Sequence, residues 1–277
     1  ADQAYEWMYQ NLQTYNNSRS GENGESTDFE KAVSKQMASG YVDYINSLKL
    51  VDTKTGEPLT LGEDGRSGRF YQYMVQKVED AATVYLNKLS EGSLDVPYTL
   101  NDCLSWDGSS AKITSLDDYL ADYNPRMKSV MAFDNLEMNE NSGENLEFGD
   151  ETHQYLHFDS YMPDVLEKLK TDYPEEYSKY AEGYDAVIGD KALAERKKLL
   201  NPLNYIGSDS VDTAEHIRIR VGTQDADTAL SVSAVLALSL ENKTDADVDY
   251  ALVWNQGHGN ADYDGELLQW IDKICKE

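Results

Sequence analysis

The sequence predicts a mostly helical domain over residues 1–210, followed by a C-terminal βαβα portion of a parallel sheet over residues 211–277. Two observations carry this prediction. Apolar residues recur at spacings of three and four through most of the first two hundred residues, as they do on one face of a helix. Beyond Asp212, two runs of strand length are separated by a helical pattern, and the order strand, helix, strand implies a parallel pair.

The N-terminal domain is expected to begin with three helices. A short aromatic helix covers residues 4–12, Thr27 and Glu30 form a capping box at the start of the next helix, and a third helix covers residues 68–89. The connector 53–69 is rich in glycine, which predicts turns. The two longer helices carry apolar residues at helical spacing: Phe29, Val33, Met37, Tyr41, Tyr44, Ile45 and Leu48 in one, and Tyr71, Val75, Val78, Ala82, Tyr85 and Leu89 in the other.

Shorter elements are expected in the remainder of this domain. Ser115 is placed to cap a helix over residues 116–123. Residues 127–157 are rich in Asn, Glu and Gly, so we expect irregular structure there. Two or three helices should follow across residues 162–200. Two prolines suit first-turn positions in these helices: Pro163 and Pro174.

The C-terminal segment is expected to contain two strands and two helices. The strands cover residues 216–221 and 248–254, a helix over 227–240 connects them, and a closing helix follows at 267–274. Two parallel strands do not form a stable domain alone, because both faces and both edges of a parallel sheet need covering. We therefore expect further strands upstream of this chain.

Charge and composition exclude several classes of partner. The formal net charge of the 277 residues is −27, so nucleic acid and anionic membranes are not expected to bind. No apolar stretch approaches the roughly 18 residues that a transmembrane helix needs. Cys103 and Cys275 lie in no metal-binding spacing, and the acidic segment 137–151 lacks the regular spacing of a calcium loop. We expect no metal and no cofactor, and a secreted and a cytoplasmic location fit the composition equally well.

Polar residues follow both predicted strands at their carboxyl ends. Asp225 lies three residues after Gly222, and His258 lies in the loop after the second strand. An α/β-hydrolase places the acid and the base of its triad in these two loops, in the chain order Ser, Asp, His. We therefore predict an α/β-hydrolase fragment in which Asp225 orients His258 and His258 acts as the general base.

The third member of such a triad is not found in the sequence. No G-x-S-x-G motif, which marks the nucleophilic serine, occurs in the 277 residues. We therefore expect the nucleophile upstream of Ala1, in an N-terminal hydrolase segment that is a necessary partner. The chain alone is expected to be inactive.

The same C-terminal residues carry a family resemblance. The runs 221–228 and 249–258 resemble the end of the bacterial tannase and feruloyl-esterase-like branch of the α/β-hydrolases. In that family a lid domain is inserted into the hydrolase fold, and four further runs resemble the entry to the lid or the lid itself: residues 4–8, 126–128, 132–134 and 143–149.

This resemblance implies a serine esterase whose lid clamps a phenolic acyl group of the galloyl or feruloyl type. It assigns the binding of the galloyl hydroxyls to Lys128, Glu144 and Asp227. The chemistry suits phenols, since carboxylates accept hydrogen bonds from phenol O–H groups and an ammonium group donates to them. Two other interpretations stay open: Lys128 and Glu144 as a solvated surface pair, and Asp227 as the cap of a helix that begins at Thr228.

Other functions also remain open at this point. The chain is alternatively a non-catalytic helical binding or interaction module, with a vestigial hydrolase remnant. It is alternatively one piece of a two-chain hydrolase, or part of an esterase or peptidase of the same fold with a non-phenolic substrate.

Overall fold

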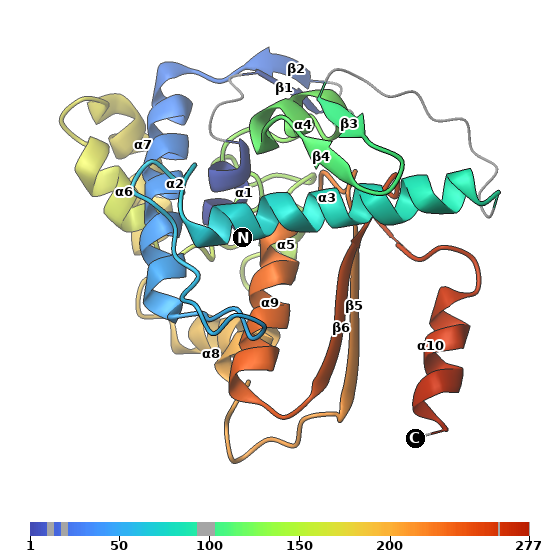
Figure 1. Cartoon of the computed structure of the whole chain (residues 1–277). Helices are drawn as coiled ribbons and strands as arrows, with labels where there is room; N and C mark the ends of the chain where they lie inside the picture. Colours follow the sequence, from blue (N-terminus) through green and yellow to red (C-terminus); the bar gives the residue numbers. More distant parts are fainter. Residues whose placement is uncertain (10–13, 18–21, 93–102, 260, 277) are drawn as a thin grey trace. The chain divides into compact units, whose positions relative to one another are not determined.

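Two compact units divide the chain, and each contains segments that are distant in the sequence. The computed structural model describes residues 1–9, 14–17, 22–92, 103–259 and 261–276 (Figure 1). Unit 1 comprises Ala1–Tyr44 and Arg126–Tyr205, and unit 2 comprises Ile45–Pro125 and Ile206–Glu277. Residues 45–125 therefore pack with the C-terminal segment. The sequence pattern, which divides the chain once after residue 210, places them in the helical domain instead. The difference arises because α3 (Arg69–Ser90) packs against the C-terminal strand β6 (Asp247–Val253).

Unit 1 is mostly helical. Its elements are α1 (Asp2–Tyr9), the antiparallel pair β1 (Thr14–Asn17) and β2 (Glu22–Glu25), most of α2 (Asp28–Leu48), α5 (Gly143–Glu147), α6 (Met162–Leu169), α7 (Pro174–Asp185), α8 (Lys191–Leu200) and a 3₁₀ turn at Pro202–Asn204. The helix predicted over residues 4–12 begins earlier, at Asp2, and residues 10–12 lie outside the described residues. Three helices occupy the region where two or three were expected.

Several of these helices begin where the capping residues and prolines of the sequence predict. The Thr27 N–H donates to Glu30 Oε2 at 2.7 Å, and the Glu30 N–H donates to Thr27 Oγ1 at 3.2 Å, which is the reciprocal capping box. Pro163 and Pro174 occupy first-turn positions of α6 and α7. The region 127–157 is not wholly irregular, because the short helix α5 forms within it.

The apolar core of unit 1 is formed where α2, α6 and α7 meet. Phe29, Val33 and Met37 on α2 pack with Val165 and Leu166 on α6, and all five are at least 95% buried. The spacing of the α2 residues puts them on one helix face, as the sequence pattern predicts.

Unit 2 combines helices with two small sheets. Its elements are α3, the antiparallel hairpin β3 (Leu104–Trp106) and β4 (Ala111–Ile113), α4 (Leu116–Tyr123), β5 (His216–Gly222), α9 (Leu230–Lys243), β6 and α10 (Glu266–Ile274). Ser115 caps α4 as predicted, because its Oγ accepts the Asp118 N–H at 3.0 Å. The hairpin of β3 and β4 was not predicted, since each of its strands has only three residues.

The strands β5 and β6 pair in parallel, and α9 packs against both (Figure 1). The register runs from His216 opposite Asp247 to Gly222 opposite Val253. Asp249 joins the strands by ion pairs to Arg218 at 2.6 Å and Arg220 at 2.7 Å. Burial acts to raise the pKa of Asp249, but the two guanidinium groups hold it below its ordinary value.

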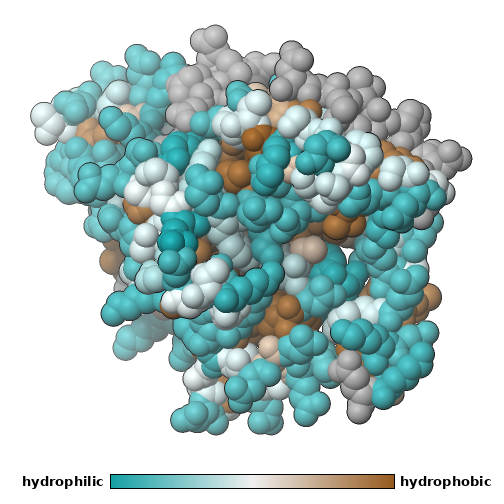
Figure 2. Space-filling view, in the orientation of Figure 1, coloured by the Kyte–Doolittle hydropathy of each residue, from teal (hydrophilic) through white to brown (hydrophobic). Residues whose placement is uncertain are grey.

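The surface is consistent with the acidic composition. Figure 2 shows a mostly hydrophilic face on which apolar patches are separate from one another. Among the described residues, no helix combines the length and apolarity needed to cross a bilayer. Neither cysteine forms a disulfide, and Cys103 is buried while Cys275 is exposed.

A buried ion pair connects α1 with the second segment of unit 1. The guanidinium of Arg126 donates to both carboxylate oxygens of Glu6, at 2.8 and 2.7 Å, and the two side chains are 2% and 0% exposed. Burial acts to lower the pKa of Arg126, but the charge and hydrogen bonds of Glu6 outweigh this effect and raise it. Such a pair is costly to break from one side, because the remaining charge stays buried without compensation.

We predict that Glu6→Gln lowers the free energy of unfolding by about 3–5 kcal/mol, since it leaves the Arg126 charge buried. Urea denaturation measures the change. The matched control is Glu167→Gln, which makes the same substitution in the exposed pair with Lys170 and should cost at most about 0.5 kcal/mol. Equal losses in the two variants would contradict the prediction.

Candidate functional site

The structure brings Asp225 and His258 together in unit 2. His258 Nδ1 lies 3.2 Å from each carboxylate oxygen of Asp225. The carboxylate is nearly buried, whereas the imidazole is 60% exposed. This geometry orients the ring and leaves Nε2 available to exchange a proton with another group. The pair can therefore act as an oriented general base.

Asp225 is held by the turn that follows β5. Its Oδ1 accepts the backbone N–H groups of Asp227 at 2.9 Å and Thr228 at 3.0 Å. Its backbone carbonyl accepts a hydrogen bond from the Asn124 side chain at 3.2 Å. These contacts determine the direction in which the carboxylate points, so the acid is rigid before any ligand arrives.

His258 is held by contacts between its own loop and the turn after β5. The Thr223 N–H donates to the Val253 carbonyl at 2.9 Å, and the Gln224 N–H donates to the Gln256 carbonyl at 2.9 Å. The Asn255 N–H donates to Thr223 Oγ1 at 3.1 Å. The parallel ladder of β5 and β6 thus continues past the strand ends and sets the distance between the acid and the base.

An aromatic layer supports these two loops. Tyr119 on α4 donates its hydroxyl to the Thr223 carbonyl, and its ring lies 5.8 Å from that of Trp254. The Tyr123 ring packs edge-on against Trp254 at 4.9 Å. Burial raises the pKa of Tyr119 well above its ordinary value, so its hydroxyl keeps the proton that it donates.

The sequence analysis did not identify Asn124, Thr223 or Tyr119 as part of the site. Their side chains act on backbone groups about a hundred residues away or in the neighbouring loop, and no local pattern reports such a contact. The sequence offered one signal for these contacts, which is that Asn124 directly follows the helix capped by Ser115.

Asp227 does not cap the following helix. The helix α9 begins at Leu230, and its N-cap residue is Ala229. The expected helix that begins at Thr228 with Asp227 as its cap is therefore not formed, and the Asp225 carboxylate instead holds the N–H groups of Asp227 and Thr228 in a turn.

Asp227 instead lies close to the acid–base pair. One ligand atom from each of Asp225, Asp227 and His258 lies within 4.8 Å of the others. Two carboxylates and an imidazole are also a donor set that a divalent cation accepts, and in the described part of the chain this is the one such group. The backbone hydrogen bonds to Asp225 match the needs of a triad acid, so the site does not require a cation to explain its geometry.

Lys128 and Glu144 both belong to unit 1, and both are half-buried. The Lys128 ammonium lies over the ring of Phe133, 4.7 Å from its centroid. Glu144 lies in the first turn of α5. Their assignment to substrate hydroxyls stays a prediction from the family resemblance.

Gly222 is a position where only glycine fits beside the histidine loop. A Cβ atom at Gly222 would lie 2.2 Å from the Gln256 carbonyl oxygen, whereas one at Gly257 would meet nothing within 4 Å. We predict that Gly222→Ala costs about 1–3 kcal/mol of stability, because the loop must move to relieve the clash. Thermal unfolding measures this cost, and the chemical shifts of the His258 ring should change with it.

The matched control for this prediction is Gly257→Ala, which adds the same methyl group within the histidine loop without a clash. Its stability and His258 chemical shifts should stay close to those of the unchanged chain. A Gly222→Ala variant that behaves like the control would show that the loop does not depend on this close approach.

The chain is similar to solved structures of tannases. No protein-family model and no curated protein matches the sequence. A tannase from Lactobacillus plantarum is 30% identical, with a TM-score of 0.76 over 99% of this chain and 55% of that chain. A tannin acyl hydrolase in complex with ethyl gallate is 32% identical, with a TM-score of 0.75 over 99% of this chain and 53% of that chain.

A third solved structure extends the similarity to another genus. The tannase of Fusobacterium nucleatum is 32% identical, with a TM-score of 0.75 over 99% of this chain and 56% of that chain. This chain therefore spans about half the length of the tannases that it matches. Over the part that it covers, the chain is therefore tannase-like in sequence and structure.

Proposed function

We propose that this chain supplies the acid and the base of a serine esterase that acts on phenolic esters. The observation that carries the proposal is the contact of His258 Nδ1 with the buried Asp225 carboxylate at the carboxyl ends of two adjacent parallel strands. Open α/β sheets place their ligands at this edge. The nucleophilic serine would come from an N-terminal hydrolase segment that precedes these residues in the complete enzyme.

The reaction follows from the roles that the two residues can take. The serine hydroxyl attacks the ester carbonyl, and His258 Nε2 takes its proton. His258 then returns this proton to the leaving alcohol, and an acyl-enzyme remains. Water attacks the acyl-enzyme with His258 again as the base, so the acid is released and the serine is restored. Asp225 keeps Nδ1 protonated and stabilises the imidazolium that forms in each half-reaction.

We further propose that Lys128, Glu144 and Asp227 select a phenolic acyl group. An ammonium group and two carboxylates are complementary to adjacent phenol hydroxyls, which both donate and accept hydrogen bonds. Two similar solved structures of tannin acyl hydrolase are complexes with ethyl gallate and with 3,4-dihydroxybenzoate, and both compounds carry adjacent hydroxyls on an aromatic ring. This similarity supports the substrate class.

Two alternatives predict different behaviour. A non-catalytic binding module would bind gallate or ferulate without turnover, even in the complete protein. A two-chain hydrolase would co-purify with a second polypeptide that carries G-x-S-x-G. The position of the acid–base pair favours the esterase, since binding alone does not require an oriented imidazole.

The first test compares the isolated chain with the complete enzyme. The isolated chain should release no methanol from methyl gallate and form no acyl-enzyme, because it contains no G-x-S-x-G nucleophile. In the complete enzyme, His258→Ala should lower kcat by at least about 10³-fold, since the serine loses its base. His153→Ala, which removes an exposed imidazole in unit 1, is the control and should leave kcat unchanged. A burst of acyl-enzyme from the isolated chain would overturn the proposed location of the nucleophile.

The second test concerns selectivity for phenols. In the complete enzyme, Lys128→Ala should lower kcat/KM for methyl gallate by about 10-fold or more, because a charge-assisted hydrogen bond is lost. It should affect methyl benzoate much less, because this ester lacks the hydroxyls. Lys191→Ala removes an exposed lysine of the same unit and serves as the control. An unchanged ratio between the two esters in the Lys128 variant would refute the assignment of Lys128.

A further inference from the structure

One face of α1 is polar and yet fully buried. Asp2, Tyr5 and Glu6 occupy positions i, i+3 and i+4 of the helix, which places them side by side, and none is more than 1% exposed. Buried polar groups need hydrogen-bond partners. All three find partners in the segment 126–134, which contains Lys128.

The first set of these contacts holds Lys128. The backbone N–H groups of Met127 and Lys128 both donate to the Tyr5 hydroxyl at 3.3 Å. The Lys128 carbonyl accepts a hydrogen bond from Arg126 Nε at 2.7 Å. Phe133, over which the Lys128 ammonium lies, packs edge-on against the Tyr5 ring with centroids 5.7 Å apart. Tyr5 therefore supports both the backbone of Lys128 and the ring beneath its charge.

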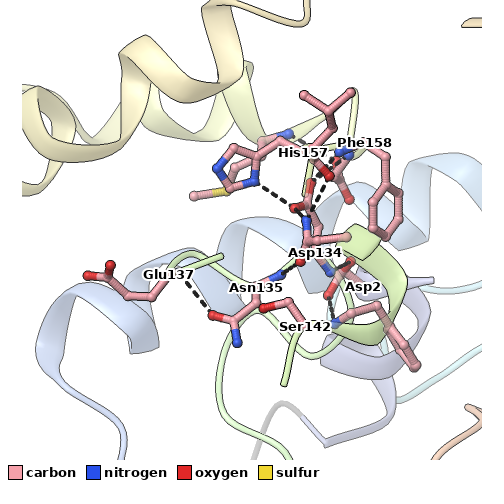
Figure 3. A network of polar contacts seen from close by, with 12 residues as sticks. Asp2, Asp134, Asn135, Glu137, Ser142, His157 and Phe158 are labelled. Atoms are coloured by element: carbon pink, nitrogen blue, oxygen red, sulfur yellow. Dashed lines mark hydrogen bonds and ion pairs between the residues drawn. The ribbon is translucent and has the colours of Figure 1, made fainter. Parts of the chain in front are cut away.

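The second set of contacts converges on Asp134, as Figure 3 shows. Asp2 accepts the Phe133 N–H at 2.9 Å and the Asp134 N–H at 3.2 Å. The Asp134 carboxylate, which is 0% exposed, accepts His157 Nδ1 at 2.7 Å and the Phe158 N–H at 2.9 Å (Figure 3). Asp134 is thus tied to α1 on one side and to the segment before α6 on the other.

Asn145 extends this network to Glu144. Its Nδ2 donates to Asp134 at 2.7 Å and to the Leu156 carbonyl at 2.9 Å, while its Oδ1 accepts the Asn135 N–H at 2.9 Å. The Asn145 side chain is fully buried in α5, next to Glu144. Because the amide uses both donors and its acceptor, it leaves α5 little freedom to rotate or shift.

We propose that Tyr5 and Asn145 are positioning residues that hold Lys128 and Glu144 in place for the hydroxyls of a phenolic acyl group. This inference rests on the proposed function, in which Lys128 and Glu144 bind those hydroxyls. Neither Tyr5 nor Asn145 needs to touch the substrate. Their contribution is preorganisation, since a binding group that is loose by about 1 Å loses much of its effect.

The test measures one ratio in the complete enzyme: kcat/KM for methyl gallate divided by kcat/KM for methyl benzoate. Tyr5→Phe removes only the hydroxyl that accepts from Met127 and Lys128, and Asn145→Ala removes the amide. Each variant should lower the ratio by about 3- to 10-fold, the value of one or two net hydrogen bonds. The change should come mainly from KM for methyl gallate.

Double mutants separate positioning from general stability. If Tyr5 acts through Lys128, Tyr5→Phe should not lower the ratio further in a Lys128→Ala background. Likewise, Asn145→Ala should not lower it further in a Glu144→Ala background. Additive losses in both pairs would overturn the inference, because they would show that each residue acts independently of its proposed partner.

A control variant accounts for loss of stability. Leu193→Ala removes a buried apolar side chain of α8 that makes no hydrogen bond to this network, and it should lower the melting temperature without changing the ratio. If Leu193→Ala lowers the ratio as much as Asn145→Ala does, the effect is destabilisation and the inference fails.

The two levels of the proposal fail in different ways. Absence of turnover by the complete enzyme, or an unchanged ratio in Lys128→Ala and Glu144→Ala, would reject the proposed function. A lowered ratio in those two variants but not in Tyr5→Phe or Asn145→Ala would reject the positioning role alone.

Discussion

The parallel register of β5 with β6 is the constraint on which the acid–base pair depends. The register ends with Gly222 opposite Val253, so β5 and β6 end at the same level of the sheet. The hydrogen bonds that join Thr223 and Gln224 to the following loop then continue the ladder. A shift of one residue in either strand would separate Asp225 from His258 and turn the flanking side chains to the other face of the sheet.

The two loops also depend on features that have no chemical role. The missing side chain at Gly222 leaves room for the Gln256 carbonyl, and the Tyr119 hydroxyl donates to the Thr223 carbonyl. Asn124 holds the backbone of Asp225 itself. The pair is therefore preorganised by groups from α4 and from the strand ends. This arrangement is what a general base needs, because its ring must be oriented before the substrate proton moves.

Unit 1 holds an irregular segment of its backbone in place by a different kind of contact. Its segment 126–134 forms no helix or strand, and hydrogen bonds to the buried side chains of Asp2, Tyr5 and Glu6 take the place of a regular ladder. A buried hydrogen-bond network of this kind favours one backbone arrangement, because another would leave buried donors and acceptors without partners. Rigid binding groups can thus be built on irregular backbone.

The sequence by itself determined those features that arise from local patterns. The capping box of Thr27 and Glu30, the helix after Ser115, and the strand–helix–strand order around Asp225 and His258 all follow from residues close together in the chain. The turn residues after β5 and β6 also predicted which two side chains would meet, because parallel strands bring their carboxyl ends together.

The tertiary structure decided what depends on distant contacts. It moved the start of α9 to Leu230, since the Asp225 carboxylate accepts the N–H groups of Asp227 and Thr228 and holds these residues in a turn. It joined residues 45–125 to the C-terminal strands, and it formed the network around Asp134. The grouping of the segments and the network around Asp134 depend on contacts between buried groups that are far apart in the sequence. The local spacing of residues carries no information about such contacts.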